Sequence, residues 1–265
     1  MEAKRSVFFV SDHTGITAEV LGHSLMARFE GLDLHYVTRP FTDSLAKVRA
    51  VALEIDQAAA EGLRPVVFGT LTDPAVAAAL KGTKGLLLDL FAPYLDALEA
   101  ELGLAPSERV GRYHRIVDLA SYQLRMDAVD FALTTDDGLG TQHYGRADII
   151  LVGVSRAGKT PTCLYLGLQY GIRAANYPLA EDDFDKMSLP RTLRDYRGKV
   201  FGLSIDPLRL HQIRRERKPN SQYAELSRCD FEVRRAEELF RSLGVTFLNT
   251  TTTSIEEISA TIMQA

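Results

Sequence analysis

Runs of apolar residues alternate with amphipathic stretches along most of the chain. Short runs such as SVFFVSD and RPVVFGT are typical of strands that are buried on both faces of a sheet. Longer stretches such as TGITAEVLGHSLMARF and SLAKVRAVALEIDQAAAEG repeat their apolar residues with helical spacing and indicate amphipathic helices. Strands and helices in alternation predict an α/β fold, in which helices cover a parallel sheet.

This alternation occurs twice, with an interruption between the two series. The first series has strands at 6–12, 32–41 and 64–70 and helices at 14–29, 44–62 and 73–82, while residues 84–91 fit either a short strand or the start of a helix. A segment rich in Pro, Gly and charge follows at 101–118, and then a helix at 121–138. The second series has strands at 147–154, 173–179, 199–206 and 245–251 and helices at 207–217, 229–244 and 254–264.

A phosphate-binding motif lies at the end of the strand at 147–154. The pattern G-x-x-x-x-G-K-[ST] is matched at every fixed position by Gly153, Val154, Ser155, Arg156, Ala157, Gly158, Lys159 and Thr160, here called the motif loop. In such loops backbone N–H groups surround phosphate, the lysine reaches the terminal phosphate and the threonine hydroxyl binds Mg²⁺. A short pattern can match by chance, but the apolar run before it and the helix after it are the context that the motif requires. We therefore expect nucleotide binding here.

Two residues in or near the motif loop have alternative interpretations. Asp206 ends the strand-like run VFGLSID, where it could hold Mg²⁺ together with Thr160, or it could cap the helix that starts at Pro207. Arg156, inside the loop, could contact phosphate oxygens or could be a solvated arginine at the loop tip. The sequence leaves both pairs of alternatives open.

Two further segments carry candidate catalytic carboxylates. In VSDHTGITAE, Asp12 could accept a proton from a hydroxyl nucleophile, or it could simply cap the following helix. Hydroxyl groups and helix N–H groups in the same segment resemble a second small anion site. In TTDDG, Asp136 and Asp137 could bind Mg²⁺ or act as a base, or they could form an ordinary solvated turn. Only geometry can rank Asp12, Asp137 and Asp206 as general bases.

Composition narrows the functional classes. The 265-residue chain has a formal net charge of -4, which argues against nucleic-acid binding, since that needs a basic face. A local exception is the basic run at 209–218, which fits either a solvated helix face or an arginine clamp for phosphate on a protein substrate. Cysteines and histidines show no metal-ligand spacing. No apolar run is long enough for a signal segment or a membrane span, so we expect a cytoplasmic protein that binds no membrane.

Together these patterns predict two α/β lobes. We expect an N-terminal parallel-sheet lobe at residues 1–110, a helical connector at 111–144 and a P-loop-type nucleotide-binding lobe at 145–265. The first boundary follows the interruption between the two series. The second precedes the strand that leads into the motif loop.

Several longer blocks resemble one protein family. The phosphoenolpyruvate synthase regulatory proteins, which belong with the pyruvate, phosphate dikinase regulatory proteins, contain segments similar to SDHTGITAEVLGHSL, DDG, ADIILVGVSRAGKTPTCLYLGLQYGIRAANYPL, KVFGLSIDPLRLHQIRRERKPNSQYA and SIEEI. The resemblance spans nearly the whole chain, from about residue 6 to about residue 262. Family members often carry a histidine directly before the Asp-Asp-Gly turn, where this chain has Thr135.

The resemblance implies a bifunctional enzyme. Members of the family phosphorylate a threonine of the target dikinase with ADP as donor, which inactivates the target. They remove the same phosphate with inorganic phosphate and release diphosphate. For this chain the resemblance implies that ADP binds at residues 153–160, with Lys159 on the β-phosphate. It also implies that phosphoenolpyruvate synthase is the protein partner, and it makes a homodimer reasonable. Lys159, Asp12 and Asp137 are then the expected catalytic residues.

Two other functions fit the residues as well. A small-molecule P-loop kinase would use ATP and carry an arginine-rich lid, and no evident lid follows the motif loop at a kinase-like distance. A non-catalytic ADP-sensing protein would bind ADP tightly without turnover. Transfer of label from ADP or ATP separates these functions from the bifunctional enzyme.

Overall fold

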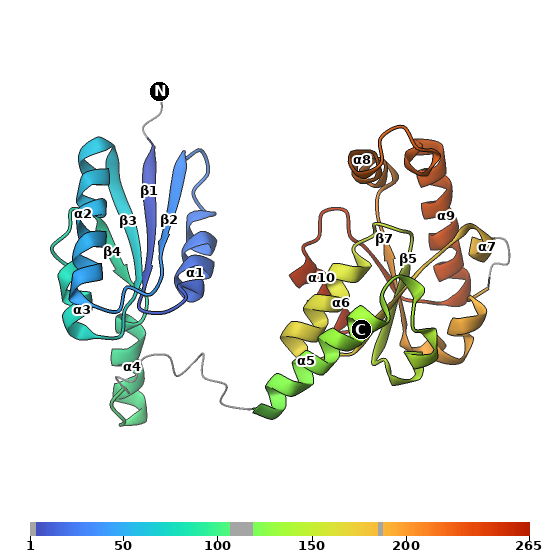
Figure 1. Cartoon of the computed structure of the whole chain (residues 1–265), viewed down its shortest axis with the longest axis horizontal. Helices are drawn as coiled ribbons and strands as arrows, with labels where there is room; N and C mark the ends of the chain where they lie inside the picture. The colour runs from blue at the N-terminus through green and yellow to red at the C-terminus, as the bar shows by residue number, and fades with distance from the viewer. Residues whose placement is uncertain (1–3, 107–118, 185–187) are drawn as a thin grey trace. The chain divides into compact units, whose positions relative to one another are not determined.

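Two parallel sheets organise the chain into two units. The computed structural model describes residues 4–106, 119–184 and 188–265, and the chain divides into Met1–Val117 and Asp118–Ala265. Each unit contains a four-stranded parallel sheet with helices on both faces (Figure 1). The predicted α/β fold with two lobes is therefore confirmed.

The first unit has a sheet with the strand order β2-β1-β3-β4. Its elements are β1 (Arg5–Ser11), α1 (Ile16–Met26), β2 (Leu34–Arg39), α2 (Leu45–Glu61), β3 (Leu63–Thr70), α3 (Pro74–Leu80), β4 (Leu86–Asp89) and α4 (Ala92–Leu102). Along β1, Phe8 and Val10 pack in the core under α2 and α3, whereas Val7 and Phe9 pack in the core under α1. Burial on both faces explains why this strand is an uninterrupted apolar run.

The segment at 84–91, which fitted two interpretations, contains strand β4. Helix α4 follows it and was not among the predicted elements, although Leu95, Leu98 and Leu102 have helical spacing. None of the residues of α4 is buried, so this helix adds nothing to the core.

The second unit has the same kind of sheet, with the order β6-β5-β7-β8. Its strands and α-helices are α5 (Leu119–Thr134), β5 (Ile149–Gly153), α6 (Lys159–Tyr165), β6 (Ala174–Pro178), α7 (Glu181–Phe184), β7 (Val200–Ser204), α8 (Pro207–Arg217), α9 (Leu226–Leu243), β8 (Phe247–Asn249) and α10 (Ile255–Ile262). Short 3₁₀ turns are η1 (Asp136–Gly138), η2 (Thr141–Arg146), η4 (Arg191–Lys199) and η5 (Gln222–Ala224), and a π-helical turn, η3 (Leu166–Tyr170), extends α6. Helices α6 and α10 lie on one face of the sheet and α9 on the other (Figure 1).

The connector predicted at 111–144 lies partly outside the described residues, up to residue 118. From Leu119 onward the segment packs within the second unit, where α5 contacts α6, η3 and β6. The helix predicted at 121–138 is therefore present as α5, but it ends at Thr134 and η1 follows it.

Helix ends follow the capping rules. Helix α10 begins with a capping box, because the side chain of Ser254 accepts the N–H of Glu257 and the side chain of Glu257 accepts the N–H of Ser254. Asp73 caps α3 and Pro74 occupies its first turn. Within the described parts of the chain, no helix is both long enough and apolar enough to cross a bilayer.

Strand order determines where a ligand can bind. In each unit the first strand, β1 or β5, lies between the second and the third. The order of the strands therefore reverses beside this first strand. Open α/β sheets bind ligands at this switch point, because the loops from neighbouring strands diverge there. The segments after β1 and β5 are the two in which the sequence indicated an anion site.

Packing around β7 gives a first prediction. An added Cβ on Gly202 would lie 2.6 Å from Cβ of Phe247 and 2.8 Å from a ring carbon of the buried Phe240. Gly202→Ala should therefore lower the free energy of unfolding by about 1–3 kcal/mol through overpacking. Gly198→Ala is the control, since nothing lies within 4 Å of its added Cβ. Urea denaturation of both variants tests this, and equal stabilities would contradict it.

Candidate nucleotide and phosphate site

The motif loop connects β5 to α6 in a turn that two glycines make possible. At its start, a Cβ on Gly153 would lie 2.2 Å from the carbonyl oxygen of Leu203 in β7, so only glycine fits. At its end, Gly158 precedes α6 with a φ of 87°, which glycine adopts without strain. Arg156 also has a positive φ, 79°, which is uncommon for a residue with a side chain. Turns of this kind at the start of a helix bind anions through successive N–H groups.

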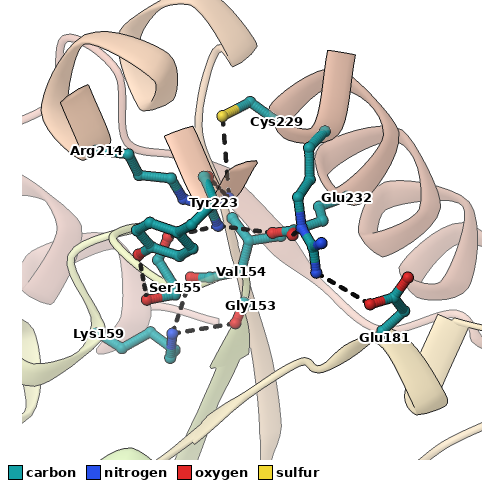
Figure 2. A network of polar contacts seen from close by, with 10 residues as sticks. Gly153, Val154, Ser155, Lys159, Glu181, Arg214, Tyr223, Cys229 and Glu232 are labelled. Atoms are coloured by element: carbon teal, nitrogen blue, oxygen red, sulfur yellow. Dashed lines mark hydrogen bonds and ion pairs between the residues drawn. The ribbon is translucent and has the colours of Figure 1, made fainter. Parts of the chain in front are cut away.

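Lys159 is almost completely buried inside this turn, with 4% of its surface exposed. Its ammonium group donates hydrogen bonds to the carbonyl oxygens of Gly153, 3.0 Å away, and Val154, 2.9 Å away (Figure 2). Burial lowers the pKa of Lys159 to about 8, and the negative charges of Asp137 and Asp136 oppose that shift. The carbonyl groups of the loop therefore fix the position of this cation.

The other residues of the motif loop have different surroundings. The side chains of Val154 and Ala157 are buried in the core, so these residues can contact a ligand only through their backbone groups. Ser155 is partly buried, and its hydroxyl lies 2.9 Å from the hydroxyl of Tyr223. Arg156 is exposed at the tip of the loop, which is compatible with both of its interpretations.

Thr160 joins the motif loop to the acidic turn of η1. Oδ1 of Asp136 accepts a hydrogen bond from the Thr160 hydroxyl over 2.8 Å and another from Nδ2 of Asn176. Asn176 lies in β6 and is 1% exposed, and its Oδ1 accepts the N–H of Asp137 over 3.1 Å. Three segments that are distant in sequence therefore meet at one point. A hydroxyl and a carboxylate are oxygen ligands of the kind that Mg²⁺ prefers.

Within the acidic turn the neighbouring residues differ in role. Asp137 has an exposed side chain and a left-handed backbone, with a φ of 51°. Thr135 is fully buried, and its hydroxyl donates to the carbonyl oxygen of Phe131 over 2.8 Å at the end of α5. The turn thus combines a structural threonine, a carboxylate that contacts the motif loop and a carboxylate that faces solvent.

Asp206 caps α8, which was one of its two interpretations. Its Oδ1 accepts the N–H groups of Leu208, at 2.9 Å, and Arg209, at 3.1 Å. Its own N–H donates to the hydroxyl of Thr251 over 2.7 Å. The carboxylate that contacts the hydroxyl of Thr160 is that of Asp136. A role of Asp206 as a metal ligand beside Thr160 stays a prediction.

Asp12 lies in the first unit, just after β1. It is 7% exposed, and its Oδ2 accepts hydrogen bonds from the N–H of Thr72, at 2.8 Å, and from the Thr72 hydroxyl, at 2.5 Å. Asp12 therefore ties the segments after β1 and β3 together. The hydroxyl of Ser11 accepts the N–H of His13 over 3.1 Å. A catalytic role of Asp12, and a second anion site beside it, stay predictions.

Two residues beside the motif loop were not identified as part of the site from the sequence. Asn176 is a polar residue within an apolar strand, and that contrast was a usable signal. Arg214 belongs to the basic run, but unlike the exposed Arg215 and Arg217 it is completely buried. It lies one helical turn after the buried Leu210, so helical spacing was the signal that could have distinguished it.

The chain is similar to known proteins over nearly its whole length. A model of the kinase/pyrophosphorylase family matches residues 7–263. Similar proteins named "putative phosphoenolpyruvate synthase regulatory protein" include one from Ectopseudomonas mendocina (strain ymp), 52% identical over 261 residues, which cover 98% of this chain and 96% of the relative. Another, from Pseudomonas aeruginosa (strain LESB58), is 51% identical over 264 residues, with 99% and 96% covered.

A third protein with this name, from Hahella chejuensis (strain KCTC 2396), is 50% identical over 261 residues, with 98% of this chain and 96% of the relative covered. The family match includes the motif loop, the acidic turn and the segment after β1. It also covers both units nearly from end to end. This chain belongs to the kinase/pyrophosphorylase family.

Proposed function

We propose that this protein is a cytoplasmic enzyme that regulates phosphoenolpyruvate synthase by two opposed reactions. In one, a threonine of the synthase receives a phosphoryl group from ADP and the synthase is inactivated. In the other, inorganic phosphate removes that group as diphosphate and activity returns. Family membership supports phosphotransfer, and the names of the relatives support the target. The junction of the motif loop with the acidic turn, through Thr160 and Asp136, carries the proposal.

In the kinase direction these residues would position the β-phosphoryl group of ADP and neutralise its charge. The N–H groups of the motif loop would surround the phosphates, and Lys159 would exchange its carbonyl partners for the β-phosphate. The threonine oxygen attacks the β-phosphorus, the bond to the bridging oxygen breaks and AMP leaves. Asp137 is our first candidate to accept the hydroxyl proton, because its carboxylate is exposed and its charge acts on Lys159.

Removal of the phosphate would use the same anion site. An oxygen of inorganic phosphate attacks the phosphorus of phosphothreonine, and the bond to the threonine oxygen breaks. Diphosphate leaves, and the threonine oxygen takes up a proton. In both directions a phosphate group lies next to the phosphoryl group that is transferred, so one cation, Lys159, can serve both reactions.

Mg²⁺ would be held by Thr160 and Asp136, whose oxygens are already within hydrogen-bond distance of each other. When bound, the ion supplies charge neutralisation for the transferred phosphoryl group. Asp206 is the alternative carboxylate, although one of its oxygens already caps α8.

Labelled donors test the proposed function. With phosphoenolpyruvate synthase and ADP labelled at the β-phosphate, we expect label on a threonine of the synthase and formation of AMP. Added inorganic phosphate should then release the label as diphosphate. Transfer only from ATP to a small molecule, or tight ADP binding without any transfer, would contradict the proposal and favour a small-molecule kinase or an ADP sensor.

A substitution at Lys159 tests whether the two reactions share one site. Lys159→Ala should lower the rates of phosphorylation and phosphorolysis by about 100-fold or more, since it removes the cation from the loop. Lys81→Ala, at an exposed lysine after α3, is the control and should leave both rates unchanged. Loss of phosphorylation with intact phosphorolysis would contradict a shared site.

Paired substitutions test the metal ligands. Asp136→Asn should weaken activation by Mg²⁺ about 10-fold to 100-fold, because an amide replaces the carboxylate that contacts Thr160. Asp206→Asn keeps a good helix cap and should change activation less than about twofold. Titration of initial rates with Mg²⁺ measures both. The reverse pattern would assign the ion to Asp206.

A further inference from the structure

Arg214 is a buried arginine whose side chain reaches the motif loop from α8 (Figure 2). Its Nη2 donates to a carboxylate oxygen of Glu232 over 2.6 Å and to the carbonyl oxygen of Ser155 over 3.2 Å. A buried guanidinium is costly unless it is paired and hydrogen-bonded. The carboxylate of Glu232 is the ion-pair partner of the guanidinium, and the carbonyl oxygen of Ser155 in the motif loop accepts a further hydrogen bond from it.

Tyr223 adds a second contact to the same loop residue. Its carbonyl oxygen accepts a hydrogen bond from Nη1 of Arg214 over 3.1 Å, and the centroid of its ring lies 4.1 Å from the guanidinium carbon Cζ. Its hydroxyl lies 2.9 Å from the hydroxyl of Ser155. Ser155 is thus held at both its carbonyl group and its side chain (Figure 2).

These contacts fix the direction of backbone N–H groups. The carbonyl oxygens of Gly153 and Val154 face Lys159, and that of Ser155 faces Arg214. In a planar trans peptide, the C=O of one residue and the N–H of the next point in opposite directions. The guanidinium therefore turns the N–H of Arg156 away from itself. Arg156 has a φ of 79°, and such conformations persist where the surroundings hold them.

We propose that Arg214, with Tyr223, is a positioning residue of the motif loop: it orients the N–H of Arg156 for a phosphate group and does not itself touch the phosphate. The inference rests on the proposed function, in that it takes the phosphates of ADP and inorganic phosphate as the ligands of the loop. Glu232 completes the arrangement, because its carboxylate pairs with the buried guanidinium of Arg214.

A double substitution separates positioning from simple stabilisation. Arg214→Met alone would leave the largely buried carboxylate of Glu232 without its partner in the core and should destabilise the fold. Arg214→Met combined with Glu232→Met removes both charges at similar volume, so the urea midpoint should return close to the wild-type value. We nevertheless expect the dissociation constants of ADP and inorganic phosphate, by calorimetry, to rise about 10-fold to 100-fold.

Arg228→Met is the matched control. Arg228 pairs with Glu232 and with Glu181 rather than with Ser155, so its loss should change ADP affinity less than about twofold. Wild-type affinity in the stable double variant would overturn the inference, because Arg214 would then be a structural residue only.

Tyr223→Phe keeps the test decisive if the double variant does not fold. The ring remains against the guanidinium and only the hydroxyl bond to Ser155 is lost. We expect an unchanged urea midpoint and a dissociation constant for ADP about threefold to tenfold higher. An unchanged dissociation constant would overturn the inference.

The same samples distinguish this inference from the proposed function. If the wild-type protein binds ADP but places no label on the synthase, the proposed reaction fails, and the affinities of the variants still decide the role of Arg214. If the wild-type protein transfers label and the double variant binds ADP equally well, only the role of Arg214 fails.

Discussion

The burial of two cations against one short turn is the constraint on which the site depends. Lys159 and Arg214 are both buried in the second unit, and neither can stay charged there without oxygen partners. The carbonyl groups of residues 153–155 provide such partners to both cations. Carboxylates of the acidic turn and of α9 provide the compensating charge. The shape of the motif loop and the packing of η1, α8 and α9 around it all satisfy this requirement.

Sheet topology brings these groups together. Parallel strands place all their carboxyl ends at one edge, so the loop after β5 and the residues after β6 and β7 gather there. The first unit repeats the strand order, and Asp12 joins the segments after its two adjacent strands β1 and β3. One architecture therefore accounts for the positions of the motif loop and Asp206 in the second unit and of Asp12 in the first.

Much of the second unit could be predicted from local patterns. Apolar runs identified β5 and β7, and the spacing of two glycines, a lysine and a threonine identified the turn between β5 and α6. The bond between Asp136 and Thr160 joins residues 24 positions apart, and it depends on how α5 and β6 pack, which no local pattern encodes. The buried position of Arg214 had a local signal in helical spacing, but a ten-residue segment with five Lys and Arg residues is more typical of a solvated face.

The Cα of Gly153 packs directly against the backbone of the neighbouring strand β7. The atom that excludes a side chain there is the carbonyl oxygen of Leu203 in β7. The first glycine of the motif is thus required by the neighbouring strand, quite apart from any phosphate. A protein designer who moved residues 153–160 to another scaffold would have to move β7 with them, because the shape of this turn is shared between two segments of the chain.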